Sequence, residues 1–507
     1  MIISRYEQFN LLIRRDPVTN NFKAVLQTTR DLLNLAQVGR AVPEWLHKVF
    51  LGMGDPASAH YSHLTAPQTL DFTDTFLSAA HVVAAFPQYE VVFRTKTGEL
   101  LSVDTAKPPF RLTFPSPNDD NDDDDDDDDD NTTSTLKKKK ILICTPYPAP
   151  QTDPYLPPEL RDIDTTRGNP IEFTAAQAEA IRSGMSAGLT LVVGPPGTGK
   201  TDVVVQTVAN LYHSFPEQRI LVVTRSNQAL NDLFTKIASR SIQSRHVLRL
   251  GLGERDLDAE EDFSRLGRVD LCLQRREKLL EVVKRLAVSV GATEDVAYSC
   301  ETAATFFASI LLPQMILFQR ALQGRCSEEE KNQLRQVPAN YSAVQQAGVK
   351  QWDELNRSEA GLLFPFKLFF LPLQQPIFPS HLSIAEQAKI GDACVKTIGD
   401  LFTELKEYRP FELLRHSRHR ADYMLASEAR IIAMTCTHAA IARQRLVETG
   451  FHFDTLVLEE AGQVLELESF IPMLLQVSGV IGKHGIIRII RIIFILHYSI
   501  DKYGVIK

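Results

Sequence analysis

The chain has 507 residues, enough for about three domains, so it is neither a peptide nor a single small module. Hydrophobic residues make up 44% of it and charged residues 23%, which is ordinary for a globular protein with a sizeable core and excludes disorder over most of the length. The formal net charge of −8 comes from a run of aspartates between Asp119 and Asp130, and the rest of the chain is close to neutral. The acidic total therefore does not exclude a nucleic-acid partner, which needs only a local basic surface.

The cysteines and the two ends of the chain bear on where the protein works. Six cysteines are scattered without a CxxC pair, which argues against a disulfide framework or zinc site and favours a reducing compartment. Residues 1–16 carry charges within their apolar part and do not resemble a signal peptide. Residues 486–496 are apolar but include Arg488 and Arg491, and they are too few to span a bilayer. We expect a soluble intracellular protein with no membrane partner.

The first part of the chain, residues 1–114, alternates helical and strand-like patterns. Apolar residues recur at helical spacing over residues 24–36, which predicts a helix. Residues 89–94 and 110–114 are rich in β-branched and aromatic side chains, which predicts strands. We interpret this region as a mixed α/β accessory domain.

Residues 115–140 hold the aspartate run followed by four lysines, Lys137 to Lys140. They predict a disordered loop, because like charges repel and there is no apolar area to bury. The lysines are either a nuclear-import signal or a balance to the acidic block, and the sequence leaves both open. Residues 141–170 are rich in proline and predict an extended linker.

From residue 171 the order of patterns becomes strand, loop and helix. Apolar runs at residues 189–193 and 219–224 flank residues 201–215, which have the apolar spacing of a helix. Near-continuous apolar strands in this order are typical of a parallel sheet with helices on both faces, so the predicted fold class is α/β.

Strand patterns return at residues 430–435 and 453–460, after a long and mostly helical block. We interpret that block, about residues 240–428, as an insertion. It interrupts one α/β domain that covers residues 171–476.

The sequence GPPGTGKT at residues 194–201 satisfies GxxxxGK[ST] at every fixed position, between a predicted strand and a predicted helix. Glycines let backbone N–H groups point at a phosphate chain, and the following helix directs its positive end there. We expect Lys200 to reach the β- and γ-phosphates of ATP and Thr201 to bind Mg²⁺. The alternative is a glycine-rich turn without function. The loop residues expected to contact the nucleotide are Gly194, Gly197, Thr198, Gly199, Lys200 and Thr201.

Two carboxylates, Glu459 and Glu460, follow the last apolar run. Ligands of open α/β sheets bind at the carboxyl edge of the sheet, where these two residues would lie. Glu459 would bind Mg²⁺ through its water shell, and Glu460 would orient or deprotonate the attacking water. Alone, the pair fits a solvated helix start equally well, and the phosphate loop is what favours the catalytic interpretation.

Three weaker signals accompany these. Gln177 could read an adenine edge with its amide or be an ordinary solvated glutamine. Residues 224–230 and 435–440 each follow a strand with small hydroxyl or amide side chains, which bind phosphate and sugar without reading bases. The alternative is helix N-capping by Ser226 or Thr437.

Taken together, FTAAQAEAI, GPPGTGKT, TRSNQALNDLF, AMTCTHAA and LVLEEAGQ resemble the ordered N-terminal motifs of superfamily 1 RNA helicases of the nonsense-decay type. The similarity runs from about residue 20 to 476. The resemblance implies a RecA-like P-loop NTPase domain, ATP and Mg²⁺ as cofactors, and ATP-dependent unwinding of RNA. Further segments resemble the spliceosomal intron-binding branch of that superfamily: residues 41–64, 70–78, 210–234 and 465–476.

That branch implies intron RNA and spliceosomal proteins as partners, a nuclear location, and RNA rather than DNA as substrate. The resemblance also implies roles for single residues. Gln177 corresponds to the glutamine that recognises adenine, and Gln463 to the one that senses the γ-phosphate. Glu459 and Glu460 correspond to the metal-binding and hydrolytic acids. The residues that correspond to the motifs gripping the RNA backbone are Ser226, Asn227, Thr435 and Thr437.

The chain also departs from the family. Most members have aspartate in place of Glu459, and the extra methylene predicts looser Mg²⁺ geometry and slow hydrolysis. The family cleaves ATP between two RecA-like domains. Residues 477–507 do not resemble part of a second such domain: they are an isoleucine-rich basic string without helicase resemblance, which we interpret as a non-family tail. We expect the 507-residue chain alone to bind ATP weakly and not to unwind RNA. The alternative function is therefore an ATP- and RNA-binding fragment without catalytic competence.

Overall fold

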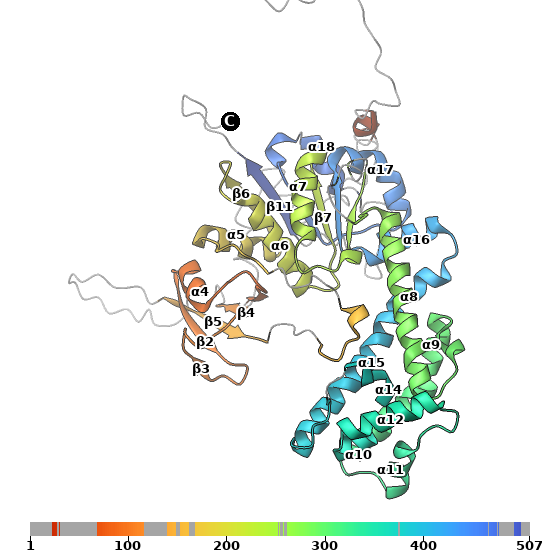
Figure 1. Ribbon diagram of the computed structural model, residues 1–507. Coiled ribbons are helices and arrows are strands. Elements are labelled where there is room, and N and C mark those ends of the chain that lie inside the picture. Colours follow the sequence, from red (N-terminus) through yellow and green to blue (C-terminus); the bar gives the residue numbers. More distant parts are fainter. Residues whose placement is uncertain are drawn as a thin grey trace, which may run out of the picture. The chain divides into compact units, whose positions relative to one another are not determined.

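The computed structural model describes residues 23–27, 30, 68–115, 139–148, 153–161, 168–251, 253, 257, 261–373, 376–464, 466–473, 475 and 491–497. The aspartate run, most of the Lys137–Lys140 cluster, and most of the helix expected at residues 24–36 lie outside these ranges. The chain forms two compact units (Figure 1). The sheet unit comprises Met1–Ala149, Asp164–Arg265 and Asp422–Lys507, and the helical unit comprises Pro150–Ile163 and Leu266–Ala421.

The sheet unit contains a six-stranded sheet in which every neighbouring pair of strands is parallel, in the order β6-β11-β10-β7-β9-β8. The residues of β7, β9 and β10 are all buried, as expected for strands covered on both faces. The predicted α/β fold class is confirmed. The strands are β6 (Gly188–Gly194), β7 (Ile220–Thr224), β8 (Val247–Arg249), β9 (Ile431–Thr435), β10 (Thr455–Leu458) and β11 (Arg491–His497).

Three helices of this unit follow strands of the parallel sheet. Helix α6 starts from the glycine-rich loop after β6, α7 follows β7, and α17 follows β9, so all three present their N-termini at the carboxyl edge of the sheet. Parallel sheets connected in this way place their ligand-binding residues at that edge. The helices are α5 (Ala175–Met185), α6 (Lys200–Ser214), α7 (Asn227–Ala238), α17 (Cys436–Glu448) and α18 (Glu466–Met473), with the short turns η5 (Ser244–His246), η10 (Met424–Glu428) and η11 (Ala461–Gln463).

Strand β11 comes from the C-terminal string that we expected to lie outside the α/β domain. It lies between β6 and β10, with Arg491 opposite Gly188 and His497 opposite Gly194 (Figure 1). Ile492 and Ile493 are buried at 0% and 3% exposure. A run of β-branched residues is typical of a buried parallel strand, and here it forms one although the string does not resemble the family. The domain boundary expected at residue 476 therefore does not match the sheet.

A second, five-stranded sheet of mixed direction precedes the parallel one, in the order β1-β4-β5-β2-β3. Its core is aromatic: the rings of Phe72, Phe76, Phe86 and Phe114 pack edge to face or tilted. The elements are β1 (Gln68–Asp71), α4 (Ala79–Ala85), β2 (Tyr89–Arg94), β3 (Leu100–Leu101), β4 (Phe110–Phe114) and β5 (Lys140–Pro146).

Strand β5 lies in residues that we expected to be an extended linker. It pairs in parallel with β2 and antiparallel with β4, and Leu142 and Cys144 are fully buried. The apolar run ILIC is short and is followed directly by a proline-rich segment, so its place in a sheet is not visible from its own composition. The accessory sheet therefore extends past residue 114, across the aspartate-rich segment.

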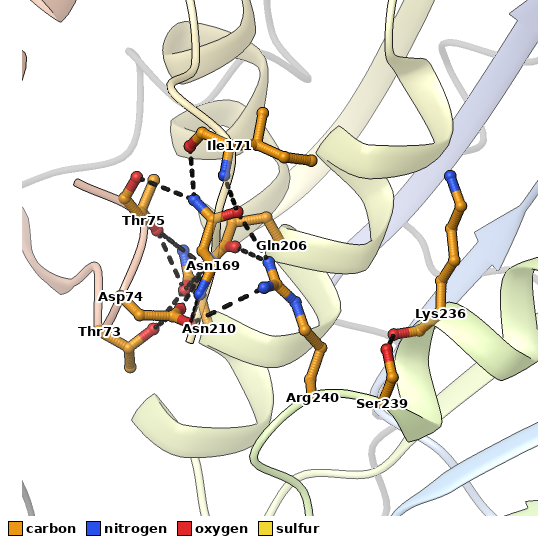
Figure 2. Close-up of polar contacts among 10 residues, drawn as sticks. All are labelled: Thr73, Asp74, Thr75, Asn169, Ile171, Gln206, Asn210, Lys236, Ser239 and Arg240. Atoms are coloured by element: carbon orange, nitrogen blue, oxygen red, sulfur yellow. Dashed lines mark hydrogen bonds and ion pairs between the residues drawn. The ribbon is translucent and has the colours of Figure 1, made fainter. Parts of the chain in front are cut away.

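A buried polar network joins the turn after β1 to helix α6 (Figure 2). Asn210 of α6 is fully buried; it accepts from the Thr73 hydroxyl at 2.6 Å and donates to the Thr75 hydroxyl at 2.8 Å. One turn earlier, Gln206 donates to Asp74 at 2.8 Å and accepts from Arg240, which follows α7. The accessory sheet is therefore held to the helix that carries the phosphate-binding loop.

The helical unit is built around two long helices, α8 and α15, joined by ion pairs from Arg275 to Glu404 and from Arg276 to Glu412. We placed the insertion at about residues 240–428, but β8 within that range belongs to the parallel sheet. The helices are α8 (Arg265–Ser289), α9 (Cys300–Phe306), α10 (Leu312–Leu322), α11 (Glu328–Arg335), α12 (Ala343–Leu355), α13 (Glu359–Leu363), α14 (Lys367–Phe370), α15 (Ile384–Leu413) and α16 (Ser417–Tyr423), with the short turns η4 (Pro158–Leu160), η7 (Glu294–Ala297), η8 (Phe307–Leu311) and η9 (Leu371–Leu373).

One stretch of the helical unit, Cys300–Leu322, is long and apolar enough to cross a membrane by length and composition. It is interrupted by the π turn η8, and Phe306 and Phe307 pack against Phe402 of α15. Length and composition alone are weak evidence for a span, because a core helix of a globular protein passes the same test.

Candidate active site

The loop between β6 and α6 has the backbone that a phosphate-binding loop needs. Gly197 and Gly199 have φ angles of +83° and +74°, in the left-handed region that favours glycine. A Cβ on Gly199 would lie 2.7 Å from the Gln177 amide nitrogen, and one on Gly194 would lie 2.9 Å from the Thr198 hydroxyl. A larger residue at Gly194 or Gly199 would therefore displace the Thr198 or Gln177 side chain, and at Gly197 and Gly199 it would also be strained by the positive φ.

Lys200 folds its side chain into this loop. Its ammonium donates to the carbonyl oxygens of Gly194 at 2.7 Å and Pro195 at 2.6 Å, and the residue is 5% exposed. Burial lowers the pKa of Lys200, and the nearby Glu459 carboxylate opposes that shift. The cation thus lies where the loop would surround phosphate oxygens.

Thr201 and Glu459 meet across the sheet edge. The Thr201 hydroxyl donates to Glu459 Oε1 at 2.8 Å, although these residues are far apart in sequence. Glu459 is 5% exposed, its Oε2 is buried and has no hydrogen-bond partner among the described residues, and burial raises its pKa. A buried carboxylate oxygen without a donor beside a threonine hydroxyl is a set of hard oxygen ligands of the kind Mg²⁺ prefers. The longer side chain of Glu459 therefore does not prevent the contact with Thr201.

Glu460 has a strained backbone. Its φ of +56° is one of two positive values among the described non-glycine residues. Such conformations cost about 1–3 kcal/mol and cluster at functional sites. The residue is half-buried, directly after Glu459 at the end of β10. Gln463, the predicted phosphate sensor, is the last residue of the short turn η11, which directly follows Glu460.

Gln177 contacts the phosphate loop directly. Its amide nitrogen donates to the Thr198 carbonyl at 3.0 Å, and its amide oxygen accepts from the Thr174 N–H at 2.9 Å in a capping box at the start of α5. The structure thus brings Gln177 beside the loop. In this arrangement its amide holds the loop to α5, and recognition of adenine stays a prediction.

The residues expected to contact RNA lie at the starts of two helices on neighbouring strands. Thr224 at the end of β7 is opposite Thr435 at the end of β9. Ser226 caps α7 by accepting from the Ala229 N–H at 3.2 Å, and Thr435 caps α17 by accepting from the His438 N–H at 3.2 Å. The cap of α17 is Thr435 and not Thr437, which lies in the first turn of α17.

Exposure differs among the four residues expected to contact RNA. Ser226 and Asn227 are exposed, Thr437 is half-buried, and Thr435 is buried at 7%. The exposed start of α7 is thus the most accessible part of this edge. Binding of RNA by the four residues stays a prediction.

Sequence reasoning missed Arg249, the last residue of β8. Its side chain is fully buried and donates to Asn227 Oδ1 at 2.9 Å and to Asn231 Oδ1 at 3.0 Å. A single arginine in a strand carries no motif. The one available signal was the pair of asparagines four residues apart, on one face of the following helix.

Two family models match parts of the chain. The family described as AAA domain matches residues 172–481, more than half of the chain. The family described as intron-binding protein aquarius insert domain matches residues 65–158, which include the accessory sheet.

Individual relatives cover different shares of the chain. RNA helicase aquarius from Mus musculus is 46% identical over 473 residues, 93% of this chain and 29% of its own length. Pre-mRNA-splicing factor cwf11 from Schizosaccharomyces pombe is 27% identical over 298 residues, 58% of this chain and 20% of its own length. DNA polymerase alpha-associated DNA helicase A from Saccharomyces cerevisiae is 32% identical over 89 residues, 18% of this chain and 13% of its own length. The chain thus spans less than a third of the length of these relatives.

Proposed function

This chain belongs to the AAA domain family and is an Aquarius-like superfamily 1 helicase, and on that premise we propose that it is the nucleotide-binding motor domain of an ATP-dependent RNA helicase of pre-mRNA splicing. The observation that carries the proposal is the meeting of Thr201 with Glu459 beside the glycine-rich loop. That contact joins the two halves of an ATP site from distant parts of the sequence.

We propose that ATP binds with its phosphates in the loop of residues 194–201. Backbone N–H groups and the N-terminus of α6 stabilise the negative charge. The Lys200 ammonium exchanges its two carbonyl acceptors for β- and γ-phosphate oxygens, which also relieves part of the cost of its burial.

The same site has residues suited to Mg²⁺ and to hydrolysis. Thr201 and Glu459 would hold the ion, which neutralises phosphate charge when bound. Glu460, next to them at the edge of the sheet, orients the attacking water or takes its proton. Gln463 follows within one turn, close enough in sequence to respond to the γ-phosphate.

We propose that single-stranded RNA crosses the starts of α7 and α17. Ser226, Asn227, Thr435 and Thr437 would bind its phosphates and sugars without reading bases, as suits a motor that moves along any sequence. By similarity to RNA helicase aquarius and the splicing factor cwf11, the RNA is an intron, the partners are spliceosomal proteins, and the location is the nucleus.

A second candidate function is binding of ATP and RNA without unwinding. The described residues form one parallel sheet with a phosphate-binding loop, which is one motor domain. The charge on the transferred phosphate is usually stabilised by an arginine that another domain supplies. The chain alone would then bind both ligands and hydrolyse ATP slowly.

Strand separation tests which function holds. The purified 507-residue chain is mixed with ATP, Mg²⁺ and an RNA duplex carrying single-stranded overhangs, with Lys200→Ala as the matched control. Unwinding above the control supports a complete motor, and ATP and RNA binding without unwinding supports the second candidate. Absence of both binding activities contradicts the proposal. A DNA duplex of the same sequence tests the preference for RNA, because the 2′-hydroxyl distinguishes the two.

A further inference from the structure

We infer that Arg249 is a positioning residue for RNA, which holds the starts of α7 and α17 in the relative arrangement that binds the RNA backbone. The inference rests on the proposed RNA-binding edge and adds a residue that touches no RNA itself. Arg249 is fully buried, so its effect acts through the side chains it contacts.

The contacts of Arg249 fix the first turn of α7. Its Nη2 donates to Asn227 Oδ1 at 2.9 Å and its Nε donates to Asn231 Oδ1 at 3.0 Å, one turn further along the same helix. Two donors of one planar guanidinium thus hold two consecutive turns. This fork determines both the rotation of α7 and the position of its first residue, which a single hydrogen bond could not do.

The turn that follows Arg249 extends the contact to α17. The Arg249 Nη1 donates to the Leu250 carbonyl, and the Leu250 N–H donates to the Ala433 carbonyl of β9 at 2.8 Å. Gly251 has a φ of +108°, and a Cβ there would lie 3.1 Å from Nδ1 of His438, which is in the first turn of α17. The Gly253 carbonyl accepts from Asn231 at 2.9 Å. Residues 249–251 and Gly253 therefore pack against the first turns of both helices.

The electrostatics at this point suit an anionic ligand. Burial, Arg249 and Arg265 lower the pKa of His438 to about 4, so the ring is neutral at pH 7. The buried Arg249 guanidinium and two helix N-termini then direct positive potential to the same edge. Because β7 and β9 are adjacent parallel strands, α7 and α17 start at the same edge of the sheet, where both can face one RNA strand.

Two substitutions test the inference. Arg249→Lys keeps the positive charge but cannot donate to Asn227 and Asn231 with two nitrogens of one planar group. Gly253→Ala keeps the arginine but places a Cβ 2.5 Å from its Nη2 and 2.6 Å from the Asn227 side chain, so the hydrogen bond between these two side chains must shift. We expect each to weaken binding of a single-stranded RNA oligonucleotide at least fivefold, with binding of ATP and Mg²⁺ changed by less than twofold.

The matched control is Arg219→Lys. Arg219 is also buried, at 4% exposure, but precedes β7 at the amino edge of the sheet, where it donates to the carbonyls of Ala429 and His452. We expect this variant to be destabilised and to bind RNA normally. Thermal unfolding of all three variants measures the structural cost separately.

The outcomes separate the inference from the proposed function. Loss of RNA affinity in Arg249→Lys and Gly253→Ala, but not in Arg219→Lys, supports the inference. Normal RNA affinity in both test variants, or equal loss of RNA and ATP affinity in all three variants, overturns the positioning role. Absence of RNA binding by the unaltered chain contradicts the proposed function and the inference together.

Discussion

Replacement of Ile493 by alanine tests whether the C-terminal string is part of the motor's core. Ile493 lies in the middle of β11, opposite Thr190 of β6 and Val457 of β10, and is 3% exposed. A Cβ on Gly184 of α5 would lie 3.4 Å from its Cδ1, so the side chain packs beneath that helix.

The expected loss of stability follows from what is removed. The change from isoleucine to alanine removes three buried carbons, worth about 0.8 kcal/mol each in transfer free energy, or about 2.4 kcal/mol. The cavity left in a parallel sheet closed by strands on both sides adds to this, so we expect a loss of about 3–4 kcal/mol. Leu191→Ala on β6 is the matched control, because Leu191 is 54% exposed and its loss should cost about 1 kcal/mol or less.

Urea unfolding measures both variants. Trp352 is buried in the helical unit, so in a Trp45→Phe background its fluorescence reports that unit, while circular dichroism follows the whole chain. Ile493→Ala should lower the midpoint of the circular dichroism transition and leave that of Trp352 unchanged. Equal effects of Ile493→Ala and Leu191→Ala would refute the placement of β11 in the sheet.

Three further predictions concern the nucleotide site and the accessory sheet. Glu459→Gln removes a buried carboxylate whose pKa is raised, so it should increase thermal stability without metal and abolish stabilisation by Mg²⁺. In the unaltered chain the Mg²⁺ affinity should fall as pH drops through that raised pKa, because the protonated carboxyl no longer binds the ion. An unchanged Mg²⁺ response of the variant in a thermal-shift titration would contradict this. Gly199→Ala should weaken ATP binding at least tenfold by calorimetry, since the new Cβ meets Gln177 and the backbone is left-handed, and binding equal to the unaltered chain would argue against the loop geometry. Asn210→Ala removes the acceptor of the Thr73 hydroxyl and of the Gln206 amide and the donor to the Thr75 hydroxyl, all in a buried network, and should cost about 2–4 kcal/mol in urea unfolding. A cost below about 1 kcal/mol would show that the network in Figure 2 contributes little.

The sequence predicted the parts of the site that are determined locally. A strand, a glycine-rich loop and a helix in direct succession define the phosphate loop, so Lys200 and Thr201 lie where their motif placed them. Glu459 follows a buried strand, and the carboxyl edge of a parallel sheet brings such positions together whatever the length of chain between them.

What the sequence did not predict depends on contacts between distant segments. Strand β5 is a short apolar run beside prolines, and its place in a sheet is determined by β2 and β4. The string that holds β11 has no family resemblance, so only its β-branched composition indicates a buried strand. Arg249 has no motif, and its role arises only where β8 meets the first turns of α7 and α17.

The most direct test of the account is the affinity of the 507-residue chain for ATP with Mg²⁺, measured by isothermal titration calorimetry beside Lys200→Ala. The account predicts saturable one-to-one binding by the unaltered chain and at least tenfold weaker binding by the variant, a difference of about 1.4 kcal/mol or more. Equal affinity of the two, or no binding by either, would contradict the assignment of residues 194–201 and Glu459 as an ATP site.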